Sequence, residues 1–255
     1  MKRRGAIVSL VALIAACVAA CAPTPLPAPT PAATDTAAAP SPSPTPAPVA
    51  YPAGATGYSI SWPQCGGPYP AAPFDIGMVG VTDGIAFTHN PCFASEWAWA
   101  SSGRYPPTVY WNVNYVECGQ RDAACDPYAY GRREAQDALE YAAGNGAHPT
   151  TWWLDIQIVS DWSKNPAHNA EAIQGAIDFF RDQGLRPAIS STGYQLSRIA
   201  GDFRPGLTSF VAAREGLEGA RAYCGAGDVF AGRGTELTAY VADGYEQVVS
   251  CGPQP

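Results

Sequence analysis

The sequence predicts an α/β fold of the (β/α)8 TIM-barrel type, small and irregular, in roughly the last 200 residues of the 255-residue chain. Three observations predict it. Eight short β-rich runs occur in this part, helical patterns fall between several of them, and no glycine-rich phosphate loop follows the first run. The missing loop counts against the alternative, an open doubly wound sheet. Little helix separates the last two runs, which predicts an irregular barrel.

The expected strands are short and rich in β-branched and aromatic residues. They are residues 57–62, 76–81, 108–115, 150–158, 187–192, 207–213, 237–242 and 247–251. Two longer helices are expected between them, over 128–143 and 166–183. The first ends at Gly144, and the second begins at Asn165 and Pro166, which suit a cap and a first helical residue. Shorter helices are expected over 95–102, 194–200 and 217–223.

The N-terminus has the pattern of an export signal. A basic start is followed by an apolar run over residues 5–16, and two segments resemble the lipoprotein cleavage box, one before Cys17 and one before Cys21. Cleavage before Cys21 leaves an even number of cysteines, six, for the domain. We therefore expect a signal peptide over 1–20 and lipidation of Cys21. The alternative is an uncleaved anchor.

The segment 21–53 is expected to be a lipidated cysteine followed by an extended linker. Residues 22–53 hold 11 prolines and no lysine or arginine, a composition that cannot bury enough surface to fold. At ~3.1 Å per residue, the linker reaches on the order of 100 Å. The sequence thus predicts a lipoprotein on the outer face of the cell membrane, with a barrel domain over 54–255.

Composition and charge exclude two classes of binding partner, nucleic acids and zinc. The net charge of −7 argues against a nucleic-acid binder, because phosphate backbones require clustered lysine and arginine. His89, His148 and His168 do not stand at metal-ligand spacing from a cysteine or from each other, which argues against a zinc enzyme. We expect no cofactor and a monomeric protein.

The run 150–158 carries the most informative polar residues. Side chains alternate along a strand, so Thr151, Trp153, Asp155 and Gln157 share one face, opposite an apolar face. Barrel enzymes place their sites at the carboxyl ends of strands. A binding or catalytic site near Asp155 is one interpretation, and hydrogen bonding within the barrel mouth is the other.

Several segments resemble the lysozyme-type muramidases of glycoside hydrolase family 25. GYSISWPQ at 57–64 resembles the opening strand of that family, WWLDIQ at 152–157 its central strand, and ISST at 189–192 its fifth strand. The start WPQC, the segment NPC at 90–92 and a closing cysteine further resemble exported bacterial proteins with a related barrel. The resemblance covers about residues 56–252, and it implies a cell-wall carbohydrate such as peptidoglycan as partner.

The chain departs from the family at two catalytic positions. Gln157 stands where the family has the acidic Glu, and Ser59 stands where it has the first-strand Asp. Asp155 remains, and Glu246 is the nearest candidate for a further acidic position of the family. An amide cannot give up a proton at usable pH, and losing general acid–base help costs roughly 10²–10⁴ in rate. The departures predict a degenerate site.

We therefore expect a glycoside-hydrolase-like protein that binds carbohydrate with weak or no hydrolysis. One alternative is an active muramidase-like enzyme whose acid comes from Asp83, Asp161 or Glu117. The other alternative is a structural envelope lipoprotein with no ligand.

Polar and aromatic residues near strand ends are the candidates for substrate binding, although burial in the core is the commoner use of tryptophan and tyrosine. The candidates are Trp62, Gln64, Asp83, Asn112, Asn114, Trp153 and Tyr194.

Six cysteines remain for the domain and allow fifteen pairings into three disulfides. Cys118 and Cys125 are seven residues apart in a polar loop, which predicts a local bridge. The resemblance to exported proteins pairs Cys65 with Cys92. Cys224 and Cys251 would then tie the last helix to the final strand.

Overall fold

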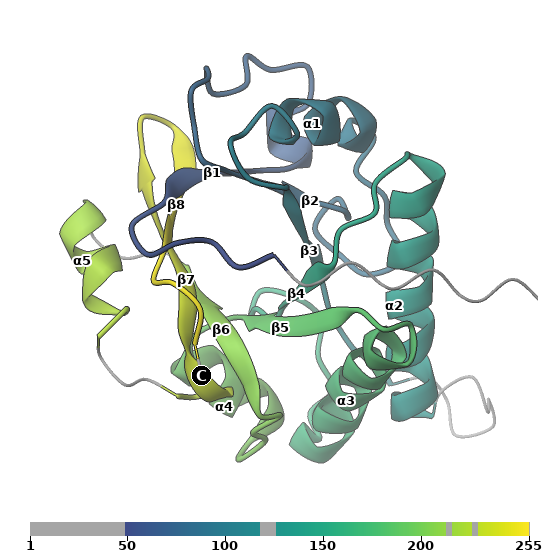
Figure 1. Cartoon of the computed structure of the whole chain (residues 1–255). Helices are drawn as coiled ribbons and strands as arrows, with labels where there is room; N and C mark the ends of the chain where they lie inside the picture. The colour runs from purple at the N-terminus through teal and green to yellow at the C-terminus, as the bar shows by residue number, and fades with distance from the viewer. Residues whose placement is uncertain (1–48, 118–125, 213–215, 226–228, 255) are drawn as a thin grey trace, which may run out of the picture. The chain divides into compact units, whose positions relative to one another are not determined.

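The computed structural model describes residues 49–117, 126–212, 216–225 and 229–254, and eight strands close into one barrel in chain order. The strands are β1 Thr56–Ile60, β2 Ile76–Gly80, β3 Thr108–Asn112, β4 Thr151–Asp155, β5 Arg186–Ser190, β6 Leu207–Val211, β7 Gly232–Ala242 and β8 Tyr245–Ser250. The helices are α1 Phe93–Ala100, α2 Pro127–Gly144, α3 Pro166–Asp182, α4 Gly193–Ala200 and α5 Gly216–Ala222. Figure 1 shows the strands as a ring with the helices outside it. The expected (β/α)8-type fold is confirmed.

The barrel is irregular where it closes. Strands β1 to β7 pair in parallel, whereas β8 pairs antiparallel with both β7 and β1. A two-residue turn, Asp243-Gly244, replaces the last helix, and both residues have positive φ, 55° and 80°. A tight hairpin of this kind requires positive φ at both positions, which Asp-Gly supplies. This hairpin explains why the last two expected strands have no helix between them.

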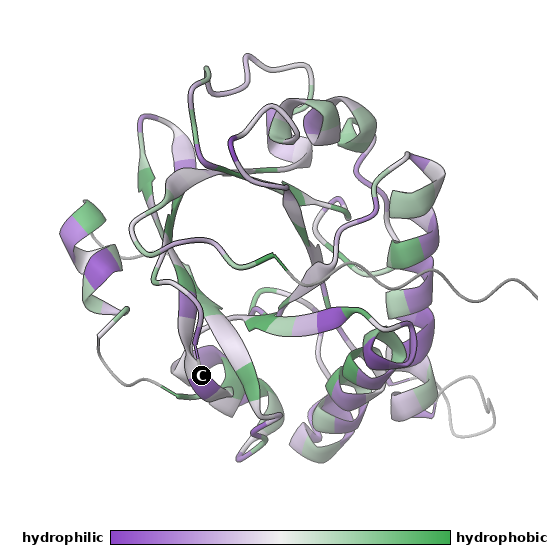
Figure 2. Ribbon diagram, in the orientation of Figure 1, coloured by the Kyte–Doolittle hydropathy of each residue, from purple (hydrophilic) through white to green (hydrophobic). Residues whose placement is uncertain are grey.

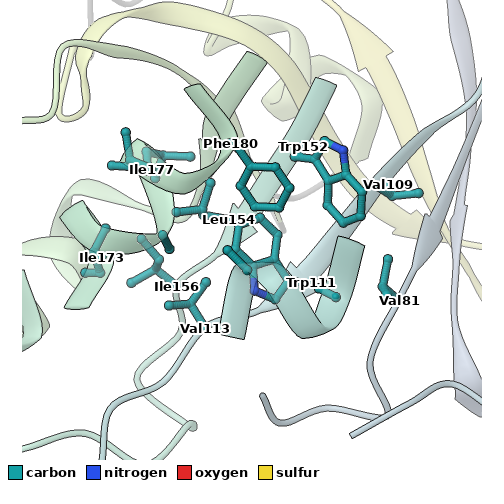
Figure 3. Close-up of a cluster of buried hydrophobic side chains, with 14 of the residues drawn as sticks. Val81, Val109, Trp111, Val113, Trp152, Leu154, Ile156, Ile173, Ile177 and Phe180 are labelled. Atoms are coloured by element: carbon teal, nitrogen blue, oxygen red, sulfur yellow. The ribbon is translucent and has the colours of Figure 1, made fainter. Parts of the chain in front are cut away.

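Two apolar layers hold the barrel together. Trp152, Leu154 and Ile156 point outward into the core beneath the helices, where the Trp152 and Phe180 rings stack 4.7 Å apart (Figure 3). Trp153 points inward to the second layer. The predicted alternation therefore holds, except that Ile158, expected on the apolar face, is 49% exposed because β4 already ends at Asp155.

The helices begin and end close to the expected residues. Asp126 and Asn165 cap α2 and α3 by accepting hydrogen bonds from the amides of Ala129 and Ala167. Hydrophilic and hydrophobic residues alternate along both helices in Figure 2, as amphipathic helices against a barrel require. Within the described ranges, none of the helices has the length and apolarity needed to span a bilayer.

The folded part begins before residue 54, which corrects the expected boundary. Tyr51, assigned to the linker, is only 2% exposed and packs on the inner layer of the core. Its hydroxyl donates to the carbonyl of Pro106 at 2.8 Å, and its own carbonyl accepts from the Ser250 hydroxyl at 3.1 Å. A large apolar ring with these partners joins the fold in spite of its proline-rich surroundings.

Two of the three predicted disulfides are confirmed. Cys65 is bonded to Cys92, which joins the segment after β1 to the start of α1. Cys224 is bonded to Cys251, which joins the segment after α5 to the end of β8. The predicted bridge between Cys118 and Cys125 lies outside the described residues.

Candidate functional site

A cavity of about 200 Å³ opens at the carboxyl end of the barrel, where several strand ends meet. Strands or adjoining loops from both halves of the chain contribute to its wall. The lining residues are Ser61, Trp62, Gly84, Tyr110, Asn112, Asp155, Gln157, Ser190, Phe210, Ala212 and Glu246. The cavity therefore joins residues that lie up to 185 positions apart in the sequence.

Asp155 is buried at the end of β4 and accepts hydrogen bonds from three side chains. The amides of Asn112 and Gln157 each donate to its Oδ2 at 2.8 Å, and the Ser190 hydroxyl donates to its Oδ1 at 3.0 Å. The strand register explains this convergence, because Asn112 and Ser190 stand beside Asp155 on the neighbouring strands. Thr82 fixes the orientation of Asn112 by donating to its Oδ1 at 2.6 Å.

The surroundings of Asp155 act on its proton affinity in opposite directions. The pKa of Asp155 is raised to about 7, mainly by burial; the hydrogen bonds from Gln157 and Ser190 act to lower it, and the charge of Glu246 acts to raise it. The three donors are placed to serve an ionised carboxylate. Asp155 thus titrates near neutral pH while its hydrogen-bond partners are arranged for the charged form.

We expect the free energy of unfolding to fall as the pH rises from about 4 to above 7. The pKa of Asp155 in the folded protein exceeds the ordinary value of 3.8. Its protonated form therefore stabilises the folded state fully at low pH, and this stabilisation is lost as the pH rises from about 4 through 7. The difference corresponds to about 4 kcal/mol. Denaturant unfolding at several pH values measures it. Asp155→Asn is expected to have a flatter profile than the wild type, and identical profiles would contradict this assignment.

Glu246 lines the cavity and forms a second pair with Ser59, a buried residue outside the cavity lining. They lie opposite each other on β8 and β1, and the Ser59 hydroxyl is hydrogen-bonded to the Glu246 carboxyl. Burial raises the pKa of Glu246, and the bond from Ser59 lowers it. The sequence aligned Glu246 only loosely, yet the structure brings it into the same cavity as Asp155.

The two departures from the family pattern therefore both contact a remaining carboxylate. Gln157 donates its amide hydrogen to Asp155, and Ser59 is bonded to Glu246. In each pair, a neutral group stands beside one acid. The cavity can exchange hydrogen bonds with hydroxyl groups, but neither Gln157 nor Ser59 can supply an acidic proton.

Two predicted substrate-binding residues lie at the cavity. The indole of Trp62 is 46% exposed on its rim, and Asn112 lies in its wall. Trp153, by contrast, is buried in the inner core and packs edge-on against Phe210, with ring centroids 5.9 Å apart. Asn114 is also buried outside the cavity, where its Oδ1 accepts from the Ala86 amide at 3.0 Å.

The other predicted residues lie outside the cavity lining as well. Gln64 caps the short helix Trp62–Gln64, where its Oε1 accepts from the Ser61 amide at 3.0 Å. Asp83 is exposed in the loop after β2. Tyr194 lies at the start of α4, where it lines a different groove.

The other two candidate acids also lie elsewhere. Asp161 lines the same groove as Tyr194, and Glu117 accepts from Ser163 and pairs with His168 at 3.0 Å.

Sequence reasoning missed Tyr110, Ser190 and Phe210 as cavity residues. Tyr110 is hydrogen-bonded to Ser61, and burial raises the pKa of its phenol. A signal for it existed, because strand alternation already placed Tyr110 on the face of Asn112. No similar signal marked Phe210. Among the residues that the structure describes, no cluster of three or more histidine, cysteine, aspartate or glutamate side chains could hold a metal ion.

The closed eight-stranded barrel, with its cavity at the carboxyl ends of the strands, is similar in fold to several solved structures. The chain is similar to the autolysin LytC of Streptococcus pneumoniae, solved with a synthetic peptidoglycan ligand, at 14% identity and a TM-score of 0.52 over 76% of this chain and 46% of that one. It is also similar to the Cpl-1 endolysin, solved with a peptidoglycan analogue (14% identity, TM-score 0.51, 79% and 55% coverage). A third similar structure is the spore cortex lytic enzyme SleM of Clostridium perfringens, at 10% identity and a TM-score of 0.50 over 78% of this chain and 68% of that one.

At these identities, the likeness shows the fold. The chain spans about half the length of the first two of these structures. No family model and no curated protein matches the sequence.

Proposed function

We propose that the domain binds peptidoglycan or a related carbohydrate in the central cavity, with weak or no hydrolysis, as an exported lipoprotein held to the membrane through Cys21. One observation carries the proposal. At both positions where the chain departs from the family pattern, the replacing residue is hydrogen-bonded to a carboxyl group. Gln157 donates to Asp155, and Ser59 is bonded to Glu246. The site keeps its polar lining while half of its acidic groups are replaced.

The chemistry of glycoside cleavage explains the expected loss of activity. It needs one carboxylic acid to protonate the leaving oxygen and a second carboxylate across the sugar ring. Asp155 accepts three hydrogen bonds within the protein, so it is poorly placed to direct a proton to a glycosidic oxygen. The solved structures of LytC and Cpl-1 contain a peptidoglycan ligand or analogue, and this supports the same ligand class here.

A second candidate function is slow hydrolysis by Asp155 and Glu246. They share one cavity, and burial raises the pKa of both. Carboxyl groups with raised pKa values are suited to proton transfer near neutral pH. Asp83, Asp161 and Glu117 are outside the lining of this cavity and are weaker candidates for the acid.

Replacing Trp62 by Ala is expected to weaken binding to purified peptidoglycan about fivefold to tenfold, because an exposed indole at the rim stacks on sugar rings. Co-sedimentation of the purified domain with insoluble peptidoglycan measures the affinity. Val229→Ala is the control, since Val229 is similarly exposed but precedes β7 at the other end of the barrel. Equal binding by both variants and the wild type would exclude Trp62 from the site.

Replacing Cys21 by Ala is expected to move the exported protein from the membrane fraction to the soluble fraction, because the thiol that carries the lipid is absent. Fractionation and immunoblotting measure this distribution. If the variant stays in the membrane fraction, the apolar run 5–22 acts as an uncleaved anchor instead.

A further inference from the structure

Another cavity, of about 320 Å³, opens at the amino end of the barrel, opposite the candidate site. The polar side chains that line it come from the end of α3 and the starts of β5, β6 and β7, and they are Arg181, Arg186, Thr208 and Arg233. Ser190 and Phe210, which line the central cavity, lie near the opposite ends of β5 and β6. The two cavities can therefore hold ligands independently of each other.

Positive charge gathers at this amino-end cavity, although the net charge of the chain is −7. Three of the 15 lysine and arginine residues line it, and none of its lining residues in the described part of the chain is acidic. Arg233 is exposed, and among the described residues it has no ionic or hydrogen-bonded partner. Arg181 pairs with Asp178 at 3.4 Å, but 46% of its side chain is exposed, and exposed pairs of this kind contribute little. Both guanidinium groups are therefore available to an anion.

The third arginine, Arg186, is held in place by a buried partner. Its Nη1 donates to Glu236 Oε1 at 3.0 Å, and its Nη2 donates to Glu236 Oε2 and to the Thr208 hydroxyl, the latter at 2.9 Å. These contacts use three of the five N–H groups of the guanidinium, and they leave the hydroxyl hydrogen of the buried Thr208 without an acceptor among the described residues. The wall of the cavity therefore keeps hydrogen-bond donors for a ligand at fixed positions, which lowers the entropy cost of binding.

We propose that this cavity binds a phosphate group, with Arg181 and Arg233 neutralising its charge and Arg186 and Thr208 donating hydrogen bonds from fixed positions. A phosphate group presents several acceptor oxygens, which suits a wall of three arginines and a hydroxyl group. A carboxylate has only two oxygens, and a single guanidinium already pairs with both. The inference goes beyond carbohydrate binding in the central cavity and does not depend on it.

The first experiment titrates the purified domain with glycerol phosphate and with acetate by isothermal titration calorimetry at low ionic strength. The domain suffices, because Pro44–Pro255 forms one compact unit. We expect glycerol phosphate to bind at least tenfold more tightly than acetate. Arg233→Gln should weaken this binding about tenfold, as the loss of one charge-assisted hydrogen bond implies, and Arg181→Gln, on a different element, should weaken it as well.

Arg104→Gln is the matched control. It removes the same charge just before β3, at the same end of the barrel but outside the lining of the cavity. Arg104 is largely exposed, with 72% of its side chain accessible, and it lies 4.0 Å from its ionic partner Asp75. This variant should therefore stay folded and bind glycerol phosphate as tightly as the wild type.

A second experiment distinguishes two sources of the phosphate, a lipid headgroup and a soluble phosphate compound. The chain enters the barrel at the same end as the cavity, since the Gly54 amide donates to the Ser250 carbonyl at 2.8 Å where β8 ends. If phosphatidylglycerol vesicles co-sediment the wild type and Arg104→Gln but not Arg233→Gln, the source is a lipid headgroup. Binding of glycerol phosphate without binding of vesicles identifies a soluble compound, and either result supports a phosphate site.

Two results would overturn the inference. If glycerol phosphate binds no more tightly than acetate, or does not bind, the cavity does not recognise phosphate. If Arg233→Gln and Arg104→Gln lose the same affinity, the charge of the surface attracts the anion and the cavity plays no part. Neither result affects carbohydrate binding in the central cavity, which co-sedimentation with peptidoglycan measures separately.

Discussion

The double variant Ser59→Asp, Gln157→Glu is expected to cleave peptidoglycan roughly 10²–10⁴ times faster than the wild type, the usual contribution of general acid–base catalysis. The Gln157 amide lies 2.8 Å from Asp155 Oδ2, so a glutamate there would share a proton with Asp155 and have a raised pKa. An aspartate at position 59 would stand beside Glu246 in the same way. Release of reducing ends from purified peptidoglycan measures the rate.

The matched control is Gln195→Glu, which makes the same chemical change on α4, outside the cavity lining. It should leave the rate at the wild-type level. The single variants Ser59→Asp and Gln157→Glu should each recover less than the double variant, because cleavage needs carboxyl groups on both sides of the sugar. A folded double variant with no gain would mean that the cavity has lost more than these two acids.

Replacing Gly131 by Ala is expected to lower the free energy of unfolding by about 3 kcal/mol, at the upper end of the usual cost of overpacking. A Cβ at Gly131 in α2 would lie 1.8 Å from the Ala172 carbonyl oxygen in α3. The contact is reciprocal, since a Cβ at Gly175 in α3 would lie 2.0 Å from the Tyr128 carbonyl oxygen. Both glycines therefore permit the close crossing of the two helices.

Gly144→Ala is the control for this prediction. Gly144 ends α2, and a Cβ added there would meet nothing within 4 Å, so the variant should match the wild type or be slightly more stable. Thermal and denaturant unfolding of the purified domain measure both effects. Equal stability of Gly131→Ala and Gly144→Ala would show that the helices can separate at no cost.

The sequence predicted the eight strands because each buries apolar side chains in a short run, a local pattern that survives folding. It did not predict the tight packing of α2 on α3. From the sequence alone, Gly131 and Gly175 are expected only to destabilise their helices, because glycine has a low helix propensity. That they allow two helices to pack closely depends on which helix lies opposite each of them. The short link between the last two runs predicted an irregular barrel but not the antiparallel β8, although Asp243-Gly244 carried a hairpin signal.

The part of the candidate site that comes from a single strand and the residues after it could be predicted from the sequence. Alternation placed Asp155 and Gln157 together, and the structure shows their hydrogen bond. The Ser59–Glu246 pair depends on closure of the barrel by the last strand and could not be found locally. Trp153 shares the inward face with Asp155 but lies deeper, because inward side chains in the middle of a strand fill the barrel core and those at its end reach the mouth.

Carbohydrate binding without hydrolysis is tested most directly by measuring binding and cleavage of purified peptidoglycan together, with the wild-type domain and with Asp155→Ala. We expect the wild type to bind the polymer and to release no more reducing ends than Asp155→Ala does. Sustained cleavage by the wild type that is lost in Asp155→Ala would contradict it, and would show that Asp155 and Glu246 form a working catalytic pair.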